Sequence, residues 1–235
     1  MLGKLDIQSL APLISWPHFF YTWNVKDNTS EADNLRCEAE AFLDKYKEKC
    51  NVNYMIHTYD VVHDGDDIII KTDAHSNVRI PFLRQQVPNS EGYCLCISDF
   101  IADKVTLFAT SVDQIMINDN VDDVYFSLLA QTLSDRMAEA AAEKIAKGVR
   151  PAVGYPSIPD MSINFILDEL MDFSRIGVEL TDSGMMMPHA SVSGFILNHP
   201  KAQYFSVGDI SEEQLLDYSQ RRGYTYEQTK RFIHA

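Results

Sequence analysis

The sequence predicts an α+β fold with an antiparallel sheet. The chain has 235 residues, of which 46% are apolar, so it can bury a sizeable core. Its strand-like and helical stretches do not alternate regularly, which disfavours a doubly wound parallel sheet. No repeat or low-complexity linker interrupts the chain, and its length alone allows one large domain or two small ones.

The first half of the chain is expected to contain a helix followed by strands. Strong helix formers with apolar residues near helical spacing fill residues 30–50. Residues 54–72 hold two β-rich runs on either side of DGDD, which indicates a hairpin. The segment over residues 78–86 is short, and its mixed composition predicts neither a helix nor a strand. Residues 93–102 and 105–112 are either strands or short helices, because their pattern does not separate the two.

The second half begins with two predicted helices. The longest helical pattern runs over residues 121–147 and ends at Gly148, a plausible stop. A second helix is predicted over residues 161–177, with Asp160 as its N-cap and Gly177 as its end.

Short strands and two capped helices complete the chain. Residues 185–200 indicate a strand, a loop and a strand, and residues 203–207 indicate another strand. Residues 211–223 and 225–233 are predicted helices. Each begins with capping-box spacing, Ser211 with Gln214 and Thr225 with Gln228.

One carboxylate in the long predicted helix lies on an apolar face. At about 100° per residue, Glu139 shares a line with Val121 and Leu128, and the opposite side is also apolar. A helix that is apolar nearly all round is expected to be buried. A buried carboxylate needs a partner. That partner is an arginine, a set of backbone donors or a ligand, and the residue pattern alone favours a structural ion pair with Arg136.

The segment RPAVGYPSIPD, residues 150–160, is expected to be a stiff loop. Proline fixes φ and removes an amide donor, and glycine allows backbone angles that other residues resist. With Arg150 at its start and Tyr155 in its middle, the loop is either a corner between elements or part of a ligand site.

Composition argues against several classes of partner and site. The net charge of −14 disfavours nucleic acid and anionic membranes, which attract basic patches. No apolar run reaches the length of a membrane span and no signal peptide is evident, so we expect a soluble, cytoplasmic protein. The four cysteines fit no zinc signature, and Cys94 and Cys96 are expected to be reduced, buried thiols in a strand.

No metal site is expected. His57, His63 and His75 lack the spacing of metal ligands. His189 is expected to be a loop histidine without a catalytic role.

Several motifs, in order along nearly the whole chain, resemble the activation domain of cobalamin-dependent methionine synthase. Each motif alone is weak, but their shared order is hard to obtain by chance. They are SWPHFFYTW (15–23), LRQQ (83–86), YCLCISDF (93–100), DRMAE (135–139), RPAVGYP (150–156), PHASVSG (188–194), NHP (198–200) and QYFSV (203–207).

The resemblance implies that residues 1–235 form a single concave domain, in which a twisted antiparallel sheet is flanked by helices. It also implies a role in reactivating the corrinoid of methionine synthase, and so in methionine biosynthesis. Domains of this family bind S-adenosylmethionine and present its methyl group to a cobalamin held by another module. One electron, from flavodoxin or a similar reductant, and that methyl group restore methylcobalamin. Carried over to this sequence, the implied ligand contacts are Glu139, Arg150, Ala152, Gly154, Tyr155 and Tyr204.

The chain also departs from the family pattern. The family's Asp before the first Trp, a ligand contact, is replaced by Ser15, which could weaken recognition of the ligand's ammonium group. Only KIAKGV separates the long helix from RPAVGYP, where long family members carry an insertion. The motifs of a cobalamin-binding module are not found in these 235 residues, so the domain is either a stand-alone chain that acts on a separate partner or a piece of a longer protein. We expect the stand-alone chain, without turnover by itself.

Two functions of different class remain open at the level of sequence. The first is a reactivation partner that uses S-adenosylmethionine, with cobalamin carried by the partner. The second is a non-catalytic binding or scaffold protein of the same fold, which contacts a corrinoid protein without using S-adenosylmethionine. Because flavodoxins are also acidic, the reductant is expected to contact the corrinoid module instead of this chain.

Overall fold

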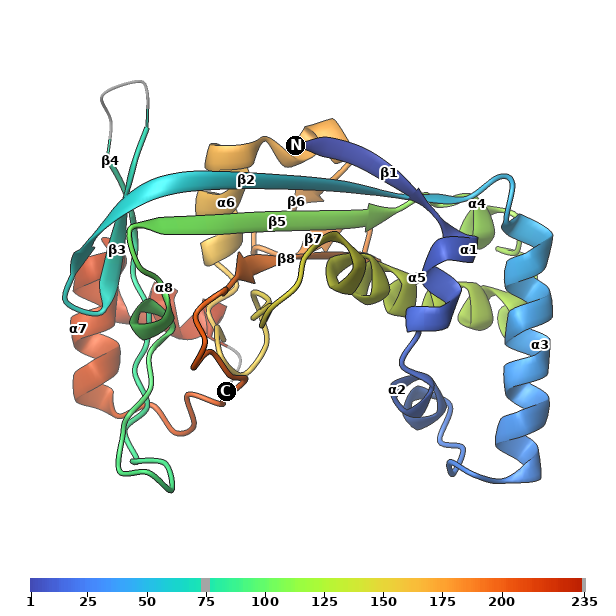
Figure 1. Cartoon of the computed structure of the whole chain (residues 1–235), viewed down its shortest axis with the longest axis horizontal. Helices are drawn as coiled ribbons and strands as arrows, with labels where there is room; N and C mark the ends of the chain where they lie inside the picture. Colours follow the sequence, from blue (N-terminus) through green and yellow to red (C-terminus); the bar gives the residue numbers. More distant parts are fainter. Residues whose placement is uncertain (73–76, 234–235) are drawn as a thin grey trace.

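The computed structural model describes residues 1–72 and 77–233, which form an arched α+β domain. Two long strands, β2 (Asn51–Asp64) and β5 (Lys104–Val112), span the molecule, and helices lie at both of its ends (Figure 1). His75 lies outside the described residues. No helix in the described part of the chain is long and apolar enough to cross a membrane. The predicted α+β class with an antiparallel sheet is confirmed.

The sheet is organised around β2. Its strand order is β4-β3-β2-β5-β8, β1 also pairs with β2, and every pairing is antiparallel. β2 and β3 join through a tight turn in which Gly65 has a φ of +63°, so the predicted hairpin is confirmed. The remaining strands are β1 (Leu2–Asp6), β3 (Asp67–Lys71), β4 (Asn77–Ile80) and β8 (Ser191–Ile196), with a separate ladder of β6 (Glu179–Leu180) and β7 (Met186–Met187).

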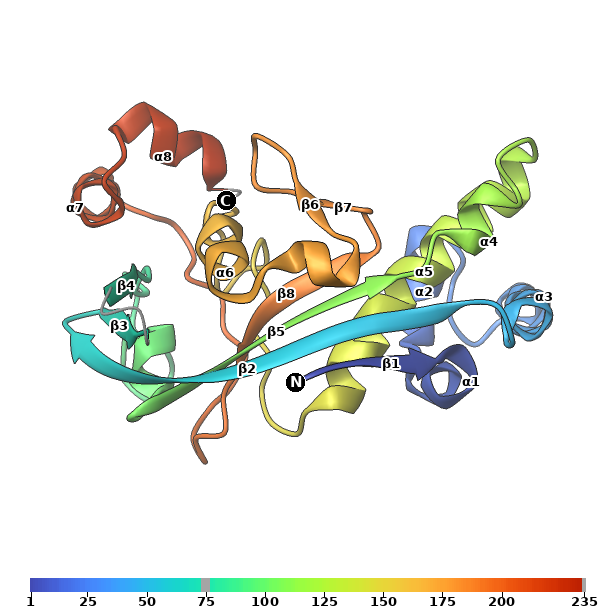
Figure 2. The ribbon, with the colours of Figure 1, turned by 90° about the horizontal axis from the view of Figure 1, so that it is seen from above.

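Helices cover both faces of this sheet. Alternate residues of a strand point to opposite faces. Accordingly, Leu107 is buried in a core with Leu167 of α6 (Ile163–Met171), whereas Phe108 packs with Ala142 of α5 (Val124–Ile145). The hydroxyl of Thr110 donates to the carbonyl of Ala138 in α5 at 3.0 Å, which ties that helix to the strand. Figure 2 shows α5 crossing the strands and α6 beside β8.

Local capping explains where most helices begin. Thr29 caps α3 (Ser30–Tyr46), and Asp123 caps α5. Ser211 and Thr225 cap the last two helices as predicted, and the reciprocal capping box is complete at Thr225. The other helices are α1 (Ile7–Leu10), α2 (Trp16–Thr22), α4 (Ile115–Asn118), α7 (Glu212–Arg222) and α8 (Tyr226–Phe232), with 3-10 turns η1 (Ala11–Leu13), η2 (Ile97–Phe100) and η3 (Phe173–Ile176).

The predicted helix over residues 161–177 is wrong in its extent. α6 ends at Met171 because Asp172 adopts a left-handed conformation with a φ of 60°, and only the short η3 follows before Gly177. Asp160 does not cap the helix as an N-cap residue. It is buried, and its carboxylate accepts from the amide of Ser162 at 2.8 Å and from the hydroxyl of Tyr218 at 2.7 Å.

Residues 93–102, for which the sequence left a strand or a short helix open, form a loop and the short helical turn η2. The expectation that Cys94 and Cys96 are buried in a strand is wrong, because Cys96 is buried but not in a strand and Cys94 is half-buried. The strand predicted over residues 203–207 is absent, because these residues form no ladder. Their backbone instead reaches the loop at Ser157, whose hydroxyl donates to the carbonyl of Phe205, while the amide of Val207 donates to the carbonyl of Pro156 at 2.9 Å.

The expectation that α5 is buried all round is wrong at its N-terminal end. Val124 is 87% exposed and Leu128 is 50% exposed. The face that carries Leu128 continues along the helix to Glu139, which is half-buried. Glu139 is therefore not a carboxylate in a sealed core, because its face lines a cavity.

Candidate functional site

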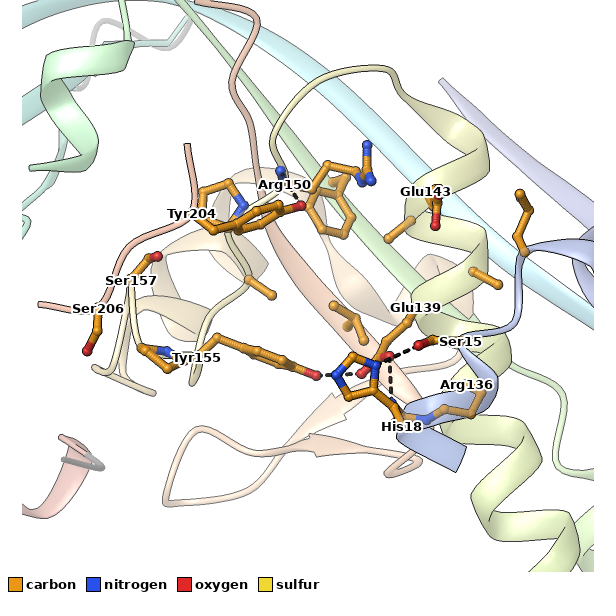
Figure 3. Close-up of a pocket in the computed structure, with 18 of the residues that line it drawn as sticks. Ser15, His18, Arg136, Glu139, Glu143, Arg150, Tyr155, Ser157, Tyr204 and Ser206 are labelled. Atoms are coloured by element: carbon orange, nitrogen blue, oxygen red, sulfur yellow. Dashed lines mark hydrogen bonds and ion pairs between the residues drawn. The ribbon is translucent and has the colours of Figure 1, made fainter. Parts of the chain in front are cut away.

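A cavity of about 860 Å³ lies between α2, α5, the 150–157 loop and residues 204–206 (Figure 3). Its volume is within the range of about 300–1,000 Å³ that is common for small-molecule sites. Six of the seven residues predicted at the site line it, and they come from four separate segments. These are Ser15, Glu139, Arg150, Ala152, Tyr155 and Tyr204.

The 150–157 loop is held beside β8 by backbone pairing. The amide of Val153 donates to the carbonyl of Ser193 at 3.0 Å, and the amide of Phe195 donates to the carbonyl of Pro151 at 3.0 Å. Ala152 lies opposite Gly194 in this pairing. A Cβ at Gly194 would stand 2.3 Å from the oxygen of Pro151, so glycine permits the close approach.

Gly154, the seventh predicted residue, does not line this cavity but a smaller neighbouring one of about 250 Å³. Its φ is +84°, and its amide donates to the carbonyl of Ile158 at 2.8 Å. A Cβ there would meet the sulfur of Met161 at 2.5 Å. Gly154 therefore shapes the turn that presents Tyr155.

Glu139 is held by two partners. Its Oε2 lies 2.8 Å from Nη1 of Arg136, which is the ion pair predicted from the sequence, and its Oε1 accepts from the hydroxyl of Tyr155 at 2.7 Å. Figure 3 shows the side chain of Tyr155 extending toward Glu139. Burial, the charge of Glu139 and the hydrogen bond to it raise the pKa of Tyr155 above its ordinary value. The phenol is thus a fixed donor that joins the loop to α5.

Arg150 and Tyr204 lie together at another part of the cavity wall (Figure 3). The amide of Arg150 donates to the hydroxyl of Tyr204 at 3.0 Å, and Nη1 donates to the carbonyls of Ala146 at 3.0 Å and Gly148 at 2.6 Å. Within the described residues, Nε and Nη2 of Arg150 have no protein partner. The guanidinium is anchored through one nitrogen and keeps donors for an acidic ligand group.

Ser15 stands at the start of α2, but its side chain does not cap that helix. Its hydroxyl lies 2.6 Å from Nδ1 of His18, and both residues line the cavity. A hydroxyl engaged in this way offers no negative charge to a ligand.

The cavity also contains residues that sequence reasoning did not assign to the site. Arg136 and Glu143 carried a signal, since both lie one turn from Glu139 on the same helix. Phe108 and Val192 had no local signal, because they form the apolar part of the wall only through the pairing of β5 with β8. The further lining residues with polar side chains are His18, Tyr21, Thr22, Ser157 and Ser206.

Each of the two histidines near the site lies beside a polar side chain, Ser15 for His18 and Asp135 for His189. Nδ1 of His189 lies 3.2 Å from Oδ1 of Asp135, beside the smaller cavity. Among residues 1–72 and 77–233, no group of three or more His, Cys, Asp or Glu side chains is placed to hold a metal ion.

Comparisons with known proteins show which family the chain belongs to. A family model described as the activation domain of vitamin B12-dependent methionine synthase matches residues 6–148 and 146–223. The two matched segments meet at residues 146–148, just before the 150–157 loop. The chain is also similar to a crystal structure of the MetH reactivation domain bound to AdoHcy, with a TM-score of 0.88 and 26% sequence identity over 99% of this chain and 88% of that one. The chain belongs to the family of the activation domain of vitamin B12-dependent methionine synthase.

Proposed function

We propose that this domain binds S-adenosylmethionine in the 860 Å³ cavity and presents its methyl group to a corrinoid held by the cobalamin-binding module of a methionine synthase. The single observation that carries the proposal is the convergence of Glu139, Arg150 and two tyrosines on one cavity. This convergence occurs in a fold that is similar to a domain bound to AdoHcy.

The chemistry of the wall fits the chemistry of this ligand. The donors of Arg150 without protein partners suit the ligand's carboxylate, because a guanidinium binds carboxylates through paired hydrogen bonds. Glu139 and the rings of Tyr155 and Tyr204 suit a sulfonium, an ammonium and ribose hydroxyls. The apolar side chains of Phe108, Ala142 and Val192 line part of the cavity and offer an apolar surface to the ligand.

The contribution of the protein is positioning. S-adenosylmethionine held by these residues would supply a methyl group, and its sulfur would keep the electron pair of the C–S bond, while a corrinoid on the partner would supply the electron pair for the new bond. No protein acid or base is required, so the fixed loop and the Tyr155–Glu139 hydrogen bond act by holding the ligand in place. Backbone pairing of the loop with β8 lowers the ordering cost of binding.

The partner supplies the corrinoid and receives the electron. We expect the reductant, a flavodoxin-like protein, to contact the corrinoid module, because the net charge of −14 on this chain opposes docking of another acidic protein. The isolated chain is expected to bind the ligand without turnover.

Isothermal titration calorimetry with S-adenosylmethionine tests the proposal. We expect saturable binding that is weakened in the Arg150→Ala variant. A folded sample that gives no heat at millimolar ligand would contradict it.

Ser15 favours the alternative, a scaffold protein that does not use the ligand, since its hydroxyl is engaged by His18. Ser15→Asp separates the two functions. Measurable affinity before the substitution supports the working site, and affinity that emerges only with Asp supports the scaffold.

A further inference from the structure

The position of the Tyr155 phenol depends on a tight turn in the site loop. The amide of Gly154 donates to the carbonyl of Ile158 at 2.8 Å, and the amide of Ile158 donates to the carbonyl of Tyr155 at 2.8 Å. From this turn the hydroxyl of Tyr155 donates to Glu139 at 2.7 Å. Whatever holds the turn in place therefore also places the phenol.

The sulfur of Met161 packs against Gly154 in this turn. A Cβ on Gly154 would stand 2.5 Å from that sulfur and 3.6 Å from Cε of Met161, so the thioether occupies the space beside the glycine. Met161 lines the smaller cavity of about 250 Å³ together with Gly154 and Tyr155, and it is not among the described residues that line the larger one. A ligand in the larger cavity would therefore meet Tyr155 but not Met161.

The backbone of Met161 is fixed on two sides. Its amide donates at 2.9 Å to the carbonyl of Phe232 in α8, which ends beside the start of α6 (Figure 2). Its carbonyl accepts from the amide of Asn164 at 3.1 Å and lies against Gly184, where a Cβ would stand 2.5 Å from that oxygen. Because α8 and the turn at Gly184 hold the backbone, the side chain starts from a defined position beside Gly154.

We propose that Met161 is a positioning residue for the ligand, which holds the Gly154 turn so that the hydroxyl of Tyr155 meets Glu139. This inference rests on the proposed function and deepens it, because it assigns the placement of Tyr155 to a residue outside the ligand cavity. A methionine suits such a support, since its unbranched side chain fills irregular gaps. The role requires apolar volume beside Gly154 and no chemistry of the sulfur.

Substitutions of Met161 test this role through the dissociation constant of S-adenosylmethionine, measured by calorimetry. Met161→Ala removes the contact with Gly154 and should weaken binding about threefold to tenfold, the range expected when one hydrogen bond is no longer held. Met161→Leu keeps an apolar side chain of similar volume and should bind as the wild type does. Circular dichroism establishes that each variant is folded.

A double variant distinguishes positioning through Tyr155 from an independent effect of Met161. In Tyr155→Phe the hydrogen bond to Glu139 is already absent, so adding Met161→Ala should cause little further loss of affinity. Residues that act through one interaction give non-additive effects, whereas independent effects add.

Met186→Ala is the matched control for a general loss of stability. Met186 is a buried methionine that lines the same smaller cavity, but none of its atoms lies within 4 Å of a Cβ on Gly154. Its truncation should lower the free energy of unfolding, measured in urea, and leave the affinity unchanged.

Amide hydrogen exchange gives a second readout that needs no ligand. The amides of Gly154 and Ile158 are bonded within the turn, and they should exchange faster in Met161→Ala than in the wild type and Met161→Leu. This measurement reports on the turn itself, independently of how tightly the ligand binds.

Four outcomes would each overturn the assignment to Met161 while the ligand site stands. They are wild-type affinity or wild-type exchange in Met161→Ala, failure of Met161→Leu to bind as the wild type does, additive losses in the double variant, and an equal loss of affinity in Met186→Ala. Failure of the wild-type chain to bind S-adenosylmethionine would instead overturn the proposed function and this inference with it.

Discussion

Gly194 of β8 and Pro151 of the loop approach each other so closely that a Cβ on residue 194 would stand 2.3 Å from the carbonyl oxygen of Pro151 and 2.8 Å from Cα of Ala152. These are backbone atoms, which cannot rotate away as the end of a side chain can. The glycine therefore sets how near the site loop lies to the sheet.

Gly194→Ala is expected to destabilise the domain by about 2–3 kcal/mol, because the loop must move away from β8. The free energy of unfolding in urea measures this effect. Gly177→Ala is the control: its Cβ would meet no atom within 4 Å, and it bears only the cost of a φ of +73°, about 1 kcal/mol. Equal destabilisation by the two variants would contradict the steric account.

Tyr155→Phe should weaken binding of S-adenosylmethionine about threefold to tenfold, because the hydrogen bond that joins the loop to Glu139 is lost. Calorimetry measures the dissociation constant. Tyr125→Phe removes an equivalent hydrogen bond, from a phenol to Glu38 at 2.7 Å, at a position that does not line the cavity. That control should bind as the wild type does, and an unaltered affinity in Tyr155→Phe would count against a positioning role.

Glu139→Gln should weaken binding of S-adenosylmethionine by about tenfold, since a part-buried negative charge near a cationic ligand is removed. Stability should fall by no more than about 0.5 kcal/mol, the usual worth of such a helical pair with Arg136. Glu40→Gln removes a helical pair of the same length, 2.8 Å, with Arg36 on α3, which is more exposed and lies away from the cavity. If both variants retain full affinity, the carboxylate at position 139 is structural only.

The stability of the domain should fall as the pH rises above about 8.5. Burial raises the pKa of the Cys96 thiol to about 11, so the folded chain keeps its proton while the unfolded chain, with an ordinary thiol, loses it. The contribution is complete below the unfolded pKa. It declines between the two values, reaching a loss of about 1.4 kcal/mol at pH 9.5.

Urea unfolding at pH 7.5 and pH 9.5 measures this loss. The Cys96→Ala variant should show a smaller decline than the wild type, whereas a variant of the exposed Cys37 should keep the full decline. If the Cys96→Ala variant loses as much stability as the wild type between pH 7.5 and pH 9.5, groups other than Cys96 cause the loss.

Elements that depend on nearby residues were predictable from the sequence. The β2–β3 hairpin follows from its turn residues, and the starts of α7 and α8 follow from the caps at Ser211 and Thr225. The ion pair of Arg136 with Glu139 follows from helical spacing alone.

Features that depend on distant residues were not predictable. Residues 203–207 look like a strand but find their partners in the side chain of Ser157 and the backbone of Pro156. The exposed position of Leu128 depends on where the packing around α5 ends, which helical periodicity does not reveal. The site residues were predictable only through the resemblance to a family. Helical spacing alone predicts an ion pair of Glu139 with Arg136 and no contact with a ligand.

The way β2 and β5 distribute their side chains has a consequence for the cooperativity of the domain. Val52 and Val112 belong to the core with α3 and α5, while Met55 and Leu107 belong to the core with α6. Because the same two strands contribute to both cores, loss of either helical layer would expose one apolar face of these strands to water. The domain should melt in a single calorimetric transition. A ligand that tightens the α5 side should also slow amide hydrogen exchange beneath α6, on the side of the sheet that it never touches.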